Sequence, residues 1–185
     1  MKLFWTIITV GMFGLLAIWS GCEDPNPIVI FEDSLTFEER LAFEEDSINQ
    51  FIQEEGYDSV FVTESGLRIV PLEPGNGTET EFGDILSVDY TGSLLNGPVF
   101  DTTDEVVAEE AGFRTDGITY VPFVTNLGDD GIIDGWTEGL ALMEEEQRVL
   151  LLIPSHLGYG IRGFFPTIGP FRILKFDMRI VRIRR

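Results

Sequence analysis

Short apolar segments separated by turn-forming residues follow one another from Gly66 onward, and they restrict the fold more than any other feature. In ILSVDYTGSL, Leu86, Val88 and Tyr90 alternate with polar residues, as expected for a strand with one buried face. ILKFDMRIVRI alternates in the same way, RVLLLIP is continuously apolar up to Pro154, and GLRIVPLE leads into the turn-rich PGNGT. The pattern predicts several antiparallel strands joined by turns.

One short amphipathic helix is expected between these strands, from Gly135 to about Met143. Trp136, Leu140 and Met143 recur there at i, i+4 and i+7, and Asp134 is a suitable N-cap. Antiparallel strands that wrap on a single short helix give an α+β domain. With 185 residues, 44% of them hydrophobic, the chain can bury one core and carry appended segments.

Charge and the scarcity of two residue types limit the chemistry. A formal net charge of −20 repels phosphate backbones, so nucleic acid is not an expected partner. Cysteine and histidine, which supply most zinc ligands, occur once each, as Cys22 and His156. His156 follows Pro154 in a turn, which favours a loop role over catalysis. No metal site is therefore expected.

The segment from Gly158 to Gly163 fits the G-x-G-x-x-G fingerprint of dinucleotide-binding loops. That fingerprint works only where a helix opens directly after it, so that the helix N-terminus faces the pyrophosphate. Here the following residues are FFPTIGPF, which cannot begin a helix. We therefore expect no dinucleotide and no other cofactor.

Aromatic residues and one acid occur beside the predicted strands and helix at spacings that suggest a single pocket. An aromatic-lined apolar pocket with one convergent acid suits a small apolar ligand, and proline is the obvious biological candidate. The alternative is that these rings simply pack in the core. The residues are Tyr90, Phe100, Asp101, Phe123, Trp136 and Tyr159.

The N-terminus has the pattern of an export signal over residues 1–21. Lys2 precedes an apolar run from Leu3 to Trp19, and Ser20-Gly21-Cys22 resembles the end of a bacterial lipoprotein signal, in which the cysteine is lipidated. The alternative is a retained membrane helix, for which the apolar run is at the short limit. Either way we expect a chain tethered to a membrane of the bacterial cell envelope, on the periplasmic side or at the cell surface.

Two acidic segments are expected to separate this signal from the main domain. Residues 22–35 are interpreted as a tether, and residues 36–65 as an amphipathic helical extension that ends near Gly56. The extension is either a spacer whose apolar side packs on the domain or a docking helix for a partner. The sequence predicts no oligomeric state. The apolar side of the helix consists of Phe37, Leu41, Ile48, Phe51 and Ile52.

The ordered set of motifs from Gly66 to about Ile183 resembles the FKBP family of peptidyl-prolyl isomerases. These motifs are G-x-x-I, PGNG, VDYTGSLLNGPVFD, LGDDGIIDGWTEGLALM, QRVLLLIP, LGYG and a final L-x-F-D-M strand. The resemblance implies a twisted, half-open antiparallel β-sheet wrapped on one short α-helix, and it assigns residues 66–185 to the isomerase domain. It also implies that the pocket binds a tacrolimus-type macrolide.

Carried onto this chain, the resemblance implies a role for each pocket residue. Asp101 would be the pocket carboxylate, and the backbone N–H of Ile133 would donate a hydrogen bond to a ligand carbonyl. The implied walls, floor and rim are Tyr90, Phe100, Phe123, Trp136 and Tyr159. Further substrate contacts are implied for Ile132, Phe164, Ile168 and Phe176.

The chain departs from the family pattern in several places. An insertion at about residues 102–122 contains DEVVAEEAG, interpreted as a short helix beside the pocket that serves as a lid or a partner surface. The family arginine that steadies the pocket acid has Arg114 as its only candidate here. Glu146 occupies a common glycine position after the helix, so the turn there is expected to need another conformation.

The function implied by this resemblance is isomerisation of X–Pro bonds in exported or envelope polypeptides, without covalent chemistry. The alternative is a non-catalytic chaperone, or an assembly subunit of an envelope or motility complex, that keeps the same fold. Lipoproteins of this layout are similar to the isomerases associated with gliding motility in bacteria.

Overall fold

The computed structural model describes residues 35–113 and 115–185. The predicted signal peptide 1–21, the lipidation site Cys22, the tether up to residue 34 and Arg114 lie outside the described residues. Within the described part of the chain, no helix is both long and apolar enough to cross a bilayer.

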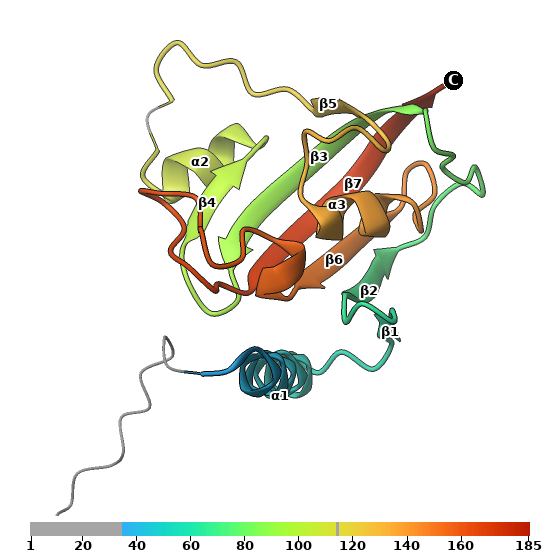
Figure 1. Cartoon of the computed structure of the whole chain (residues 1–185). Helices are drawn as coiled ribbons and strands as arrows, with labels where there is room; N and C mark the ends of the chain where they lie inside the picture. Colours follow the sequence, from blue (N-terminus) through green and yellow to red (C-terminus); the bar gives the residue numbers. More distant parts are fainter. Residues whose placement is uncertain (1–34, 114) are drawn as a thin grey trace, which may run out of the picture. The chain divides into compact units, whose positions relative to one another are not determined.

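Seven strands in the described residues form one antiparallel sheet, in the order β1-β2-β6-β7-β3-β4, with β5 paired to β3 as well (Figure 1). The long strands β3 and β7 lie side by side at its centre. The fold class predicted from the sequence, an open antiparallel sheet with few helices and a helical extension, is confirmed. The strands are β1 (Phe61–Val62), β2 (Arg68–Glu73), β3 (Ile85–Leu94), β4 (Val99–Thr102), β5 (Phe123–Asn126), β6 (Arg148–Ile153) and β7 (Leu174–Arg184).

Helix α3 (Asp134–Leu140) covers one face of the sheet and forms the main core with it. Gly135 and Gly139 allow this close packing, because a Cβ at either position would lie 2.5 Å from the side chain of Ile153 or Leu151. The predicted helix is present, but Asp134 is not its N-cap. Ile133 holds that position without a side-chain hydrogen bond, and Asp134 is the first helical residue, where its charge suits the helix N-terminus.

Helix α1 (Phe37–Glu55) packs on the opposite face. A capping box between Thr36 and Glu39 begins it, and Gly56, in the left-handed conformation, ends it. Ile48 and Phe51 join a second apolar cluster with β2 and β6. Alternate residues of β6 therefore meet α3 and α1, which explains why RVLLLIP is apolar without alternation. Of the two interpretations of this helix, packing on the domain is the one observed.

The sheet-facing side of α1 is more polar than the sequence suggested. Phe37 is 61% exposed, whereas Arg40 and Glu44 are buried. The Glu44 carboxylate accepts hydrogen bonds from the backbone N–H of Ser155, at 2.7 Å, and from its hydroxyl, at 2.6 Å. The Arg40 guanidinium lies 3.6 Å from the centre of the Phe171 ring. Polar contacts thus join α1 to the segment that runs from the 3₁₀ turn η2 (Ser155–Leu157) to residue 171.

The insertion leaves the sheet between two strands that pair with the same edge of β3. β4 pairs with Thr91–Ser93 and β5 with Ile85–Val88, so the intervening chain departs and returns beside Tyr90. The insertion contains the short helix α2 (Glu105–Glu110), which the Asp104 side chain caps. A helix was expected there from the sequence.

The turn before β6 contains an L-residue in the left-handed region. Glu146 has a φ of 68°, so the expectation of another conformation at this glycine-like position is wrong. Its N–H donates to the carbonyl of Ile180 at 2.7 Å, which holds the turn against β7. The hydrogen bond fixes the backbone and leaves Glu146 strained.

We expect Glu146→Gly to raise the free energy of unfolding by about 0.5–1 kcal/mol. A left-handed backbone costs an L-residue about 1–2 kcal/mol, and the larger unfolded-state entropy of glycine offsets part of that gain. Urea denaturation measures the change. As a control, Glu109→Gly in α2 should lower stability, since glycine is unfavourable within a helix. A loss of stability in Glu146→Gly would contradict the prediction.

Candidate functional site

A cavity of about 470 Å³ opens where α3, β3, β4 and the segment after η2 meet, and we call it the aromatic cavity. Nearly all the residues predicted from the sequence line it, and Ile168 is the exception. Asp130 and Gly131, which the sequence analysis did not single out, line it too. The lining residues are Tyr90, Phe100, Asp101, Phe123, Asp130, Gly131, Ile132, Ile133, Trp136, Tyr159, Phe164 and Phe176.

Trp136 lies at the centre of this aromatic group. Only 5% of the residue is exposed, and its ring lies nearly perpendicular to three others. The ring centres are 4.9 Å away for Tyr90, 5.1 Å for Phe176 and 5.8 Å for Phe123. Edge-to-face pairs of this kind stabilise one another beyond their burial. The cavity therefore has a rigid apolar floor.

One backbone N–H and one indole N–H near this floor have no partner among the described residues. The N–H of Ile133, at the N-cap of α3, makes no hydrogen bond within the described part of the chain. The indole Nε1 of Trp136 is buried and is likewise without an acceptor among those residues. A buried donor that stays unpaired costs about 1–3 kcal/mol. The Ile133 N–H is thus free to donate to a carbonyl brought by a ligand.

Asp101 lies at the exposed edge of the cavity. The hydroxyl of Tyr90 donates to Asp101 Oδ2 at 2.5 Å, and the N–H of Thr102 donates to Oδ1 at 2.9 Å. Burial, followed by the hydrogen bond to Asp101, raises the pKa of Tyr90. Burial and the Asp101 charge also raise the pKa of Tyr159. Both hydroxyls therefore remain protonated donors at neutral pH.

The rim is formed by the segment that follows η2. The Tyr159 ring stacks on Phe164, with ring centres 5.2 Å apart, and Phe164 is 58% exposed. Ile168 is only 1% exposed and belongs to the main core, where its carbonyl accepts the Phe164 N–H at 2.7 Å. Ile168 therefore lies behind the rim rather than in the cavity. The sequence shows only that Ile168 is apolar, which fits a residue in the cavity and a residue in the core behind it equally well.

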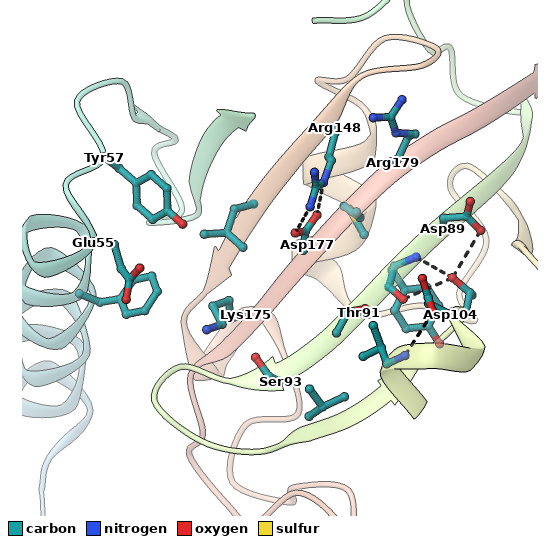
Figure 2. Close-up of a pocket in the computed structure, with 17 residues that line it drawn as sticks. Glu55, Tyr57, Asp89, Thr91, Ser93, Asp104, Arg148, Lys175, Asp177 and Arg179 are labelled. Atoms are coloured by element: carbon teal, nitrogen blue, oxygen red, sulfur yellow. Dashed lines mark hydrogen bonds and ion pairs between the residues drawn. The ribbon is translucent and has the colours of Figure 1, made fainter. Parts of the chain in front are cut away.

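A larger hollow of about 690 Å³ lies on the opposite face of the sheet and is polar (Figure 2). Arg148 crosses it, with hydrogen bonds of 2.7 Å to Asp177 and 3.0 Å to Glu73. Arg179 pairs with Glu73 as well. Hydrogen bonds from both arginines lower the pKa of Glu73. These charges neutralise one another across β2, β6 and β7, whereas Lys175, on the same lining, lies over the Phe51 ring at 5.0 Å from its centre.

The tyrosines of the cavity predict how stability depends on pH. The folded chain holds the Tyr90 proton to a higher pH than the unfolded chain does. Above about pH 10 the unfolded state has lost protons that the native state keeps, so the free energy of unfolding falls as pH rises. We expect Tyr90→Phe to make this alkaline fall shallower. Urea denaturation at several pH values tests this, and equal slopes in the two proteins would contradict it.

The sequence matches a known protein family and is similar to several known proteins. The family model for FKBP-type peptidyl-prolyl cis-trans isomerase matches residues 77–181. FK506-binding protein 1 of Rhizopus delemar is 34% identical over 119 residues, which are 64% of this chain and 98% of that protein. Outer membrane protein MIP of Legionella longbeachae is 29% identical over 126 residues, 68% of this chain and 48% of that protein. The chain thus spans about half of the latter's length.

Solved structures show the same similarity in three dimensions. The crystal structure of a peptidyl-prolyl cis-trans isomerase from Pseudomonas syringae pv. tomato superposes with a TM-score of 0.60 and 26% sequence identity. The superposition covers 82% of this chain and 98% of that one. This share of the chain is larger than the part that the family model matches.

Proposed function

Because the chain belongs to the FKBP-type peptidyl-prolyl cis-trans isomerase family, we propose that its aromatic cavity binds a prolyl ring and lowers the barrier to rotation of the preceding peptide bond. The observation that supports this most is the Trp136 floor beside a free Ile133 N–H. A ring on the floor would place its flanking carbonyl groups near that donor and near the Tyr159 hydroxyl.

The cavity would act on the polarity of the amide. Rotation about a peptide bond faces a barrier of about 18–20 kcal/mol, because twisting the bond removes its resonance. The planar amide is more polar than the twisted one, so transfer from water to an apolar cavity favours the twisted form. Lowering the rotational barrier by about 4 kcal/mol would accelerate isomerisation roughly a thousandfold.

Hydrogen bonds would add to this effect by holding the groups on either side of the rotating bond. The Ile133 N–H would fix one carbonyl, while Tyr159 donates to a second. Donors aligned before the reaction favour the transition state without further reorganisation. No nucleophile and no proton transfer is required, in keeping with a lining of aromatic and aliphatic groups with two carboxylates.

Asp101 would act by fixing the Tyr90 hydroxyl at the cavity edge. We expect Asp101→Ala to lower kcat/KM by about tenfold, the value of a lost charge-assisted hydrogen bond, while stability changes by less than about 1 kcal/mol. Asp130→Ala is the matched control, since Asp130 is also an exposed acid on the lining but has no hydrogen bond to a cavity ring. Equal losses of rate in both variants would show that charge, and not Tyr90, is responsible.

The proposed activity is tested with the purified full chain and a peptide of the Ala-Leu-Pro-Phe type. We expect catalysed cis-to-trans exchange that tacrolimus suppresses. Tacrolimus, also called FK506, is the ligand named in FK506-binding protein 1, the relative from Rhizopus. Exchange no faster than the uncatalysed reaction, whose time constant is roughly 10–100 s, would refute the proposal.

We further propose that the chain works in the bacterial envelope, anchored by lipid on Cys22. Support comes from the apolar run and the Ser20-Gly21-Cys22 sequence, and from the name of the Legionella relative, an outer membrane protein. Mass spectrometry of the full chain from bacterial membranes should find an acylated N-terminal Cys22. An intact, unmodified N-terminus would favour a retained membrane helix instead.

A second candidate function is holding unfolded chains without catalysis. Exposed apolar side chains at the rim favour it, since Ile161 is 71%, Phe164 58% and Phe165 70% exposed. Suppression of aggregation that persists in Trp136→Ala would support this function. It would replace the first proposal only if the wild-type chain showed no isomerase rate.

A further inference from the structure

A second cavity of about 550 Å³ adjoins the aromatic cavity on the side of the insertion, and we call it the side cavity. The two cavities share Tyr90, Phe100, Asp101 and Phe123. The rings of Tyr90 and Phe123 lie 6.3 Å apart and nearly perpendicular. A ligand in the aromatic cavity is therefore separated from the side cavity only by this shared wall.

The topology of the sheet places the insertion at this wall. Because β4 and β5 both pair with β3, the chain between them has to leave and return on either side of Tyr90. In Figure 1 the inserted segment, with α2, lies beyond β4 and returns to β5 over a long loop. The loop supplies walls that β3 and β4 alone could not provide.

The walls contributed by the insertion are mainly apolar, with Thr103, Thr119 and Tyr120 as their polar members. Phe113, Ile118, Val121 and Pro122 line the side cavity, with Ile118 50% and Val121 58% exposed. Asp101 is the only charged side chain among the described residues that line it, and Tyr90 and Thr102 already occupy its oxygens. A hollow with this single, already hydrogen-bonded acid suits an apolar side chain and disfavours an anionic one, as does the net charge of −20.

We infer that the side cavity is a specificity subsite, which receives a large apolar side chain within two residues of the substrate proline. The inference rests on the proposed prolyl-binding role of the aromatic cavity. Successive residues of an extended peptide advance by about 3.3–3.6 Å, so a neighbour of a proline bound on Trp136 reaches across the Tyr90–Phe123 wall. The insertion thereby selects substrates by the sequence around proline.

The test uses the purified full chain and a set of peptides with a central Ala-Pro. One leucine replaces alanine at each of the flanking positions in turn, up to two residues from the proline. We expect leucine to raise kcat/KM by about tenfold at one of these positions, as burial of a leucine side chain allows. Calorimetric titration of the same peptides gives Kd independently of catalysis.

Two exposed valines of the insertion give matched variants. Val121 lines the side cavity, whereas Val106, on α2 and 63% exposed, lines neither cavity. We expect Val121→Ser to reduce the leucine effect at that position to less than about twofold, a loss of most of the apolar contact. Val106→Ser should keep the full effect. Ile118→Ser repeats the test from a second wall residue.

Each outcome has a distinct meaning. Equal leucine effects in Val121→Ser and Val106→Ser at every position would overturn the subsite while leaving the isomerase intact. Absence of catalysis by wild type, with a leucine-dependent Kd that Val121→Ser abolishes, would refute the proposed activity and keep the subsite. If Val121→Ser alone changed the oligomeric state in light scattering, the surface would be a self-association site, and the inference would be wrong.

Discussion

Trp136→Ala is expected to lower kcat/KM for proline peptides by about 10–100-fold, because the prolyl ring loses an apolar contact of roughly 1.5–3 kcal/mol. It should also lower the free energy of unfolding by about 3–5 kcal/mol, as removal of a buried aromatic side chain usually does. Both effects follow from the position of Trp136, which is only 5% exposed, belongs to the core and forms the floor of the cavity. Peptide exchange rates and urea denaturation measure the two losses separately.

Leu140→Ala separates these contributions. Leu140 lies one turn further along α3, is fully buried in the same core, and does not line the aromatic cavity. We expect it to cost about 2–5 kcal/mol of stability with little change in kcat/KM, provided that both variants are assayed where they are folded. If Leu140→Ala lost as much activity as Trp136→Ala, the effect of Trp136 would be a general consequence of weakened packing.

Glu44→Ala is expected to lower the free energy of unfolding by about 3 kcal/mol, the result of leaving two buried donors of Ser155 without a charged acceptor. Glu44 is 2% exposed, and both of its oxygens accept hydrogen bonds of 2.6–2.7 Å. Because Ser155 begins the segment that carries Tyr159, this change should also disturb the rim. Urea denaturation gives the energy, and amide hydrogen exchange over residues 155–171 reports the local effect.

Glu54→Ala is the control for Glu44. Glu54 is an exposed acid on the same helix with a single side-chain hydrogen bond to Gln50, so its removal should change stability by less than about 0.5 kcal/mol. A small effect of Glu44→Ala, similar to that of Glu54→Ala, would mean that α1 is a spacer held by Ile48 and Phe51 alone.

The strand pattern and the position of α3 could be predicted because they depend on periodicity. Alternation in β3 and β7 marks their buried face, and Trp136 and Leu140 mark the inner side of α3. Spacing suggested part of the aromatic cavity but left core packing open, since periodicity shows that a ring is buried and not that it borders a hollow. The family resemblance added the remaining members, Ile132, Ile133, Phe164 and Phe176. Ile168 illustrates this limit, because it matches the pattern and yet packs behind the rim.

Other features depend on contacts between distant residues, which no local pattern contains. The buried Glu44 pairs with Ser155, 111 residues away, and in sequence it is one acid among many on an acidic helix. The left-handed Glu146 is held by the carbonyl of Ile180 on another strand. β5 (Phe123–Asn126) is too short to show alternation, and it forms because β3 offers a free edge.

The central claim, that a prolyl ring lies on Trp136, is tested most directly by isotope-filtered nuclear Overhauser measurements on the labelled full chain with an unlabelled proline peptide. We predict contacts from the prolyl ring protons to the indole of Trp136 and to the rings of Tyr90 and Phe176. Contacts confined to the polar hollow around Arg148 would contradict the claim. So would prolyl contacts to Tyr90 and Phe176 that keep their full intensity in Trp136→Ala.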